Sequence, residues 1–207
     1  MRISCLILFL ILFSSPGLSE TSFQFDVDKD WRGERIELPP KFAQAMTWKG
    51  TEVIRFAPGM FQVESETFFT YVIVFLLDPA SDVTPKATQQ QLLHYFQGLA
   101  SSVSRGKRRA VDVDGFQLEL GSWQKKSVDR RERETTTGTL KWVEPFRTMS
   151  NQTLQLRVEK WNHADQPAIL VTLSPQPFDH SVWNELGRIA KTFRFGDESS
   201  DERAKNN

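Results

Sequence analysis

An α+β fold is what this sequence predicts, with a single antiparallel sheet of about six strands and two helices packed on one face of it. Two segments repeat their apolar residues at helical spacing, whereas six short runs either alternate apolar and polar residues or are apolar throughout, as strands are. The expected order is two strands, a helix, four strands and a second helix. Strands that follow one another without intervening helices favour antiparallel pairing.

The first half of the chain is expected to contribute two strands and the longer helix. Residues 51–57 alternate well enough for a strand. Residues 68–77 are rich in aromatic and β-branched types, which favours a central strand covered on both faces. Thr84 and Pro85 form a typical helix start. The apolar positions that then recur on one helical face, up to about residue 106, are Leu92, Phe96, Leu99 and Val103.

The second half is expected to contribute four strands and the shorter helix. Apolar residues alternate with polar ones in residues 116–120, 135–143 and 154–159, and a short apolar run follows at 169–173. Asp179 is a plausible cap for a helix that ends near Arg194. The apolar residues on its face are Val182, Leu186, Ile189 and Phe193.

The amino-terminal residues 1–19 have the pattern of an export signal. Arg2 precedes an apolar run, and small residues lead up to Ser19, after which we expect cleavage. The run is shorter than the roughly 20 apolar residues that a membrane span needs. The mature chain is therefore expected to have no stable membrane anchor.

Residues 20–196 are expected to form one α+β domain, and residues 197–207 a disordered charged tail. The single cysteine, Cys5, lies in the predicted signal, so the mature chain has no thiol for disulfides, nucleophilic catalysis or cysteine-zinc sites. An exported chain without disulfides favours a bacterial periplasmic or secreted location.

Residues 31–43 (WRGERIELPPKFA) and 54–61 (IRFAPGMF) resemble the opening of a group of small exported bacterial proteins of uncharacterised function. This resemblance implies no activity. In element order, a sheet with one helix in the middle and one at the end resembles the PsbP/Mog1-type domains, which are mostly non-catalytic assembly or accessory factors. That resemblance implies an accessory role, although topology alone does not determine function.

Residues that could carry catalysis are few. The histidines are His94, His163 and His180, and none has a second histidine at metal-ligand spacing; the sequence predicts no metal site and no cofactor. The closest acidic pairs, Glu64 with Glu66 and Asp112 with Asp114, are neighbours beside turns, which favours solvated loop charges over a glycosidase pair.

Charge gives little indication of a polyanionic partner. The chain has 26 basic and 26 acidic residues, so no general positive field attracts nucleic acid, and we expect none to bind. The one basic cluster is Arg105, Lys107, Arg108 and Arg109, after the first predicted helix. It is either a solvated helix end or a site for a phosphate, an anionic lipid headgroup or an acidic polymer.

Two of the six tryptophans fall on the polar phase of their predicted strands. Alternation places Trp123 with Gln117 and Glu119, and Trp161 with polar neighbours of its own strand. If the two strand ends lie close together, Trp123 and Trp161 form a binding platform for a sugar, a lipid chain or a protein. A bulge at Gly121 would instead return Trp123 to the core.

These observations favour an exported, non-enzymatic accessory or binding domain whose partner is an envelope protein, a glycan or a lipid. The first alternative is a carrier of a lipid or small amphipathic ligand, with the sheet curved around an apolar cavity. The second is a hydrolase that uses an unrecognised carboxylate pair.

Overall fold

The computed structural model describes residues 23–24, 27–128, 131–163 and 165–195, and these divide into two units. In the smaller unit, β1 (Phe23–Gln24) pairs antiparallel with β10 (Arg194–Phe195). The larger unit, Phe25–Phe193, holds every other element. The predicted signal and the predicted charged tail lie outside the described residues.

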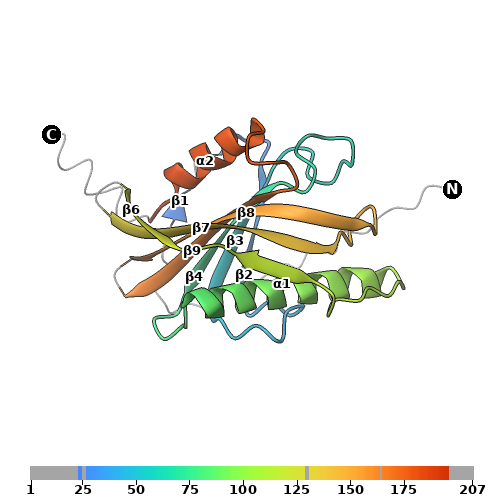
Figure 1. Ribbon diagram of the computed structural model, residues 1–207, viewed down its shortest axis with the longest axis horizontal. Coiled ribbons are helices and arrows are strands. Elements are labelled where there is room, and N and C mark those ends of the chain that lie inside the picture. The colour runs from blue at the N-terminus through green and yellow to red at the C-terminus, as the bar shows by residue number, and fades with distance from the viewer. Residues whose placement is uncertain (1–22, 25–26, 129–130, 164, 196–207) are drawn as a thin grey trace. The chain divides into compact units, whose positions relative to one another are not determined.

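The larger unit contains one antiparallel sheet of eight strands (Figure 1). The order across the sheet is β2-β3-β4-β9-β8-β7-β5, and β6 pairs with β7 beside this path. Strands β2, β3 and β4 pair in chain order on one side of β9, and β8 and β7 pair with each other on its other side. Strand β9 therefore lies between β4 and β8. The strands are β2 (Arg32–Leu38), β3 (Gly50–Phe56), β4 (Tyr71–Leu77), β5 (Gln117–Leu120), β6 (Gln124–Val128), β7 (Arg131–Val143), β8 (Asn151–His163) and β9 (Gln166–Ser174).

Two helices accompany this sheet. Helix α1 (Pro85–Gly106) begins as predicted, because the side-chain oxygen of Thr84 accepts a hydrogen bond from the Ala87 N–H at 3.3 Å. Helix α2 (Val182–Thr192) begins after Ser181 rather than at an Asp179 cap, and its end precedes Arg194. Among the described residues, no helix is both long and apolar enough to cross a membrane.

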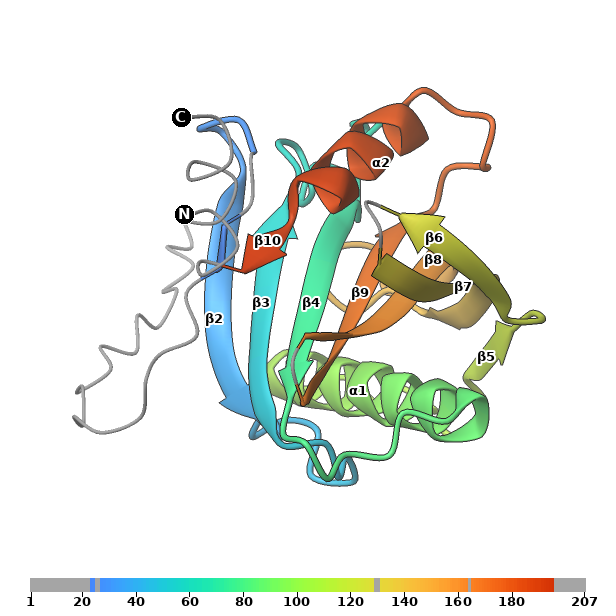
Figure 2. The ribbon, with the colours of Figure 1, turned by 90° about the vertical axis from the view of Figure 1, so that its left-hand side faces the viewer.

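The α+β class and the antiparallel sheet are confirmed, but the placement of both helices on one face is wrong. Every residue of β4 is buried, so each face of this central strand is covered. Tyr71, Ile73 and Phe75 pack in the core that α1 covers, whereas the alternate residues point to the opposite face, where α2 contacts β4 and β9. Figures 1 and 2 show the sheet between the two helices.

The main core lies between the sheet and α1. Aromatic rings fill it: Phe75 lies 5.4 Å from Trp48 and 5.8 Å from Tyr95, measured between ring centroids. A Cβ on Gly98 of α1 would lie 2.3 Å from the Phe42 carbonyl oxygen, so only glycine permits this close approach of the segment before β3. Further core residues are Met46, Leu92, Phe96, Ala100, Leu154, Leu156, Val158, Ile169 and Val171.

Two strands of the eight-stranded sheet go beyond the predicted order, and both are polar. The edge strand β2 exposes its first four residues, and β6 exposes Gln124, Lys125, Lys126 and Ser127. Neither strand has the apolar alternation that identifies a half-buried strand, because neither buries a full face. The charged side chains along β2 are also a common protection against edge-to-edge aggregation.

Candidate functional site

A pocket of about 430 Å³ lies at the end of the sheet where β7 begins and β8 ends; we call it the strand-end pocket. Its lining includes Lys125 of β6, Arg133 of β7, Lys160 and Trp161 of β8, and Ala168 of β9. Four strands therefore converge on it. Val83, just before α1, completes one wall.

The register of β7 and β8 places the side chains of this pocket. Glu134 is paired with Lys160, and their side chains form a cross-strand ion pair with an N–O distance of 3.3 Å. Lys160 Nζ also donates a hydrogen bond to the Val83 carbonyl oxygen at 3.1 Å. Because side chains alternate along a strand, the next residues, Arg133 and Trp161, point to the α2 face.

Arg133 and Trp161 form a buried stack in the pocket wall. The guanidinium carbon of Arg133 lies 4.5 Å from the centre of the Trp161 ring, and the two residues are only 3% and 5% exposed. Arg133 Nη1 donates to Glu159 Oε2 at 2.9 Å, which pairs the buried charge. Phe193 packs against the indole edge to face, at 5.7 Å between centroids. Cation–π stacking and the ion pair together compensate for the burial of the guanidinium.

Two N–H groups of this stack have no hydrogen-bond partner among the described residues. They are Arg133 Nε and Trp161 Nε1. A similar stack on the same face differs on this point: Arg157 lies 4.8 Å from the Trp183 ring, but Trp183 Nε1 donates to the Gln176 carbonyl oxygen at 3.0 Å. A buried donor without a partner costs about 1–3 kcal/mol. The strand-end pocket therefore has two donors whose bonding is incomplete.

The predicted tryptophan platform is not formed, because Trp123 and Trp161 lie on opposite faces of the sheet. Trp161 has the predicted phase, but α2 and Phe193 cover that face, so the ring is buried. Trp123 follows Gly121, where the alternation is interrupted, and it packs half-buried against the α1 core. Its ring lies 4.8 Å from Lys160 Nζ, so both indoles still flank the end of β8. Whether either binds a ligand stays a prediction.

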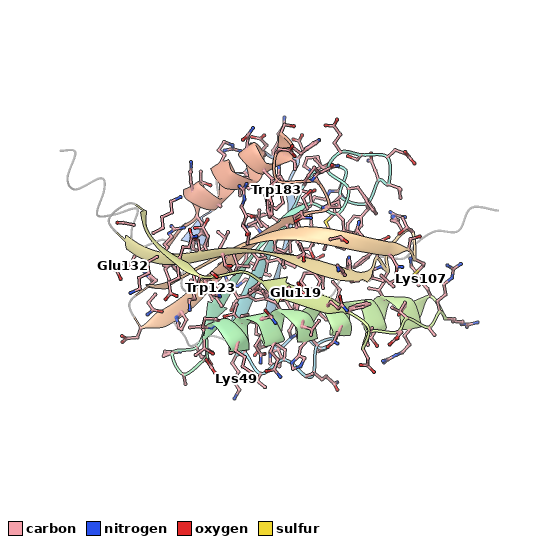
Figure 3. All side chains as sticks on the ribbon, viewed as in Figure 1. Lys49, Lys107, Glu119, Trp123, Glu132 and Trp183 are labelled. Carbon is pink, nitrogen blue, oxygen red and sulfur yellow. The ribbon has the colours of Figure 1, made fainter. Side chains whose placement is uncertain are left out.

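The predicted basic cluster lies far from this pocket. Arg105, Lys107, Arg108 and Arg109 are exposed at the carboxyl end of α1, whereas Val83 precedes its amino end. The helix has 22 residues, which at about 1.5 Å per residue amounts to roughly 33 Å. Figure 3 shows Lys107 at one end of this unit and Trp123 with Glu132 at the other. The tentative binding residues therefore belong to two separate surfaces.

The histidines and the acidic pairs are dispersed over several elements. Among the described residues, no three His, Cys, Asp or Glu side chains form a group that could hold a metal ion. A second pocket, of about 200 Å³, brings Glu66 together with His180 and Glu185. Hydrogen bonding to Arg188 lowers the pKa of Glu185, which favours the ionised form rather than a proton donor.

One buried carboxyl group has a strongly raised pKa. Glu52 of β3 is fully buried, and Tyr95 Oη of α1 donates to its Oε1 at 2.7 Å. Burial raises the pKa of Glu52 from 4.5 to about 8; the bond from Tyr95 lowers it in part, and the charge of Glu34 adds to the rise. Burial also raises the pKa of Tyr95 and of Tyr71. Glu52 has the same strand phase as the apolar residues Ile54 and Phe56. This phase could have predicted that Glu52 is buried, but it was not interpreted that way.

Comparison with known proteins gives weak matches to solved structures. No protein-family model matches the sequence, and no curated protein matches it. One solved structure with a similar arrangement is the solution structure of cyanobacterial PsbP (CyanoP) from Synechocystis sp. PCC 6803. The match covers 89% of this chain and 98% of that chain, at 13% sequence identity and a TM-score of 0.44.

Proposed function

We propose that this chain is an exported, non-enzymatic binding domain and that the strand-end pocket is its ligand site. The observation that carries the proposal is the pair of buried donors, Arg133 Nε and Trp161 Nε1, without partners among the described residues. Nearly all buried polar groups in proteins are bonded to protein, water or ligand. A ligand acceptor atom placed at this stack would complete their hydrogen bonding.

The pocket indicates the chemistry of such a ligand. Its volume, about 430 Å³, lies within the range of small-molecule sites. The indole and guanidinium planes suit a flat or apolar ring, and the exposed cation of Lys125 suits a carboxylate or another anionic group, whereas Lys160 is already paired with Glu134. Because both N–H groups are covered, binding requires a shift of the pocket rim, which the exposed side chains of Lys125 and Glu132 form.

Two further observations support a binding role over the alternatives. Glu132 and Glu134, the carboxylates of the pocket, lie two residues apart on one strand, whereas glycoside hydrolysis needs carboxylates on opposite sides of the bond. A carrier needs an apolar hollow, but the core between the sheet and α1 is occupied by rings such as Phe75 and Tyr95. The proposal that the chain is exported depends on the signal pattern of its amino-terminal residues 1–19.

Calorimetric titration of the mature protein tests the proposal. The probes are benzoate, indoleacetate, inorganic phosphate and a glucuronate oligosaccharide. We expect an aromatic carboxylate to bind, and Trp161→Phe, which removes the free N–H but keeps a ring, to weaken binding about tenfold. Arg133→Lys should also weaken it, because lysine cannot reproduce the planar stack.

The matched control is Trp183→Phe, which alters the second stack, where the indole N–H already has a partner. It should leave the affinity unchanged. Equal affinity in the wild type, Trp161→Phe and Arg133→Lys would refute the assignment of the site, and the absence of any heat with every probe would refute the ligand class.

A further inference from the structure

The end of the larger unit opposite the strand-end pocket exposes apolar side chains. Phe61 and Val63 are 40% and 48% exposed, and they are the large apolar side chains that the described part of the chain leaves open to water. Both lie in the link between β3 and β4. The Phe61 ring lies 6.1 Å from Phe56 and 5.7 Å from Phe146, so its base is packed while its outer part is exposed.

Cations lie close to the Phe61 ring and to the loop on which it packs. The guanidinium carbon of Arg147 lies 5.9 Å from the centre of the Phe61 ring. Lys107 Nζ donates a hydrogen bond to the Phe146 carbonyl oxygen, which joins the end of α1 to the same loop. The exposed residues of this surface, which we call the basic-aromatic end, are Phe61, Val63, Arg105, Lys107, Arg108, Arg109 and Arg147. Figure 3 shows Lys107 at this end.

The backbone of the basic-aromatic end is held by hydrogen bonds before any partner arrives. Arg108 has a φ of 55°, and its N–H donates to the Arg105 carbonyl oxygen at 2.9 Å, which closes the turn after α1. The Glu144 carboxylate accepts from the N–H groups of Arg147, at 2.9 Å, and of Thr148, at 2.6 Å, which orders the β7–β8 loop. A preorganised surface loses little conformational entropy on binding.

The charge of this surface is positive. It has five cations, against Glu64 and Glu66 in the β3–β4 link and the Glu144 carboxylate of the β7–β8 loop, so its net charge is +2. Asp112 and Asp114 flank Val113, whose carbonyl oxygen accepts a hydrogen bond from Gln97 Nε2 of α1 at 3.0 Å. They therefore lie beside the middle of α1 and not at its carboxyl end. Exposed apolar side chains beside a group of cations are typical of surfaces that rest on anionic bilayers.

We propose that the basic-aromatic end docks on the surface of an anionic lipid membrane. The cations lie among the lipid phosphates while Phe61 and Val63 enter the boundary between headgroups and acyl chains. A nucleic acid or another soluble polyanion would neutralise the cations but would leave the two apolar side chains in water. Because the chain is expected to lack an anchor after cleavage, this docking is reversible, and it leaves the strand-end pocket facing away from the lipid.

Co-sedimentation with vesicles tests the proposal on the mature protein. We expect binding to phosphatidylcholine vesicles that contain phosphatidylglycerol, weakening as salt is added, and little binding to phosphatidylcholine alone. Arg108→Glu with Arg109→Glu should lower the affinity at least about tenfold, since each basic residue contributes about fivefold. Phe61→Ser with Val63→Ser should lower it by a similar factor.

The matched control is Lys86→Glu with Lys126→Glu, which reverses two exposed lysines outside the basic-aromatic end. These changes should leave vesicle binding within a factor of two to three, about the scatter of such measurements. The proposal is overturned if the control weakens binding as much as the arginine pair, if the serine pair has no effect, or if the protein binds heparin but no vesicle.

Discussion

Replacing the buried carboxylate of Glu52 by an amide should change how the stability of this protein depends on pH. Glu52 lies between β3 and α1 with no exposure to solvent, and only its Oε1 has a hydrogen-bond partner among the described residues. Glu52→Gln keeps the shape and an acceptor for Tyr95 but removes the titration. The comparison therefore isolates the cost of ionising this one group.

The magnitude follows from the pKa of Glu52, which is 4.5 in an unfolded chain and about 8 in the folded protein. Between these values the folded state holds a proton that the unfolded state has released, so folding takes up a proton and the free energy of unfolding falls as pH rises. Each pKa unit corresponds to about 1.4 kcal/mol. Over roughly 3.5 units the loss is on the order of 5 kcal/mol, a large part of the roughly 5–15 kcal/mol that stabilises a typical domain.

Urea unfolding followed by tryptophan fluorescence, repeated from pH 4.5 to 8.5, measures this effect. Below pH 4.5 the contribution of the protonated carboxyl is fully present, so the wild type and Glu52→Gln should have similar stability. Above pH 8 the variant should be the more stable by several kcal/mol, because an ionised carboxylate is then buried only in the wild type. Glu119→Gln, at an exposed position of β5, is the control. Parallel stability curves for wild type and Glu52→Gln would refute the reasoning.

Two further predictions concern packing. Phe75→Ala in the central strand β4 should cost about 3–5 kcal/mol, because the ring is fully buried between Trp48 and Tyr95; an unchanged melting temperature would contradict the core assignment. Trp183→Phe should cost about 1–2 kcal/mol more than Trp161→Phe, since both lose the same volume but only Trp183 loses a hydrogen bond. Equal costs in urea unfolding would show that the Trp161 N–H is bonded after all.

Strands and helices with a buried face were predictable from their apolar spacing. The run at 68–77 contains β4, and the Thr84 cap marks the start of α1. By contrast, β2 lies at the sheet edge and forms without an apolar period, through pairing with β3. Gly33 shows how specific that pairing is, because a Cβ there would lie 2.7 Å from the Ile54 carbonyl oxygen of the paired strand. Such contacts between distant residues have no signature in one local window.

The candidate site was predicted only in part. Trp161 was identified by its phase, but its burial depends on the stacked Arg133 and on Phe193, which directly follows α2. Arg133 lies in a run of charged residues, 131–134, and no local pattern predicted its burial. Arg133 belongs to the candidate site because it stacks on Trp161, and this stack forms because the β7–β8 register places the two residues beside each other.

By itself, the amino-acid sequence determined which segments with a buried face become strands and helices, because this depends on the period of apolar residues. Only the tertiary structure decided that α2 lies opposite α1, that Glu52 is enclosed, and that two incompletely bonded donors meet in one pocket wall. Each of these depends on which strands become neighbours. Strand pairing depends on the combined burial of many residues that are distant in the sequence, so a local pattern cannot predict it.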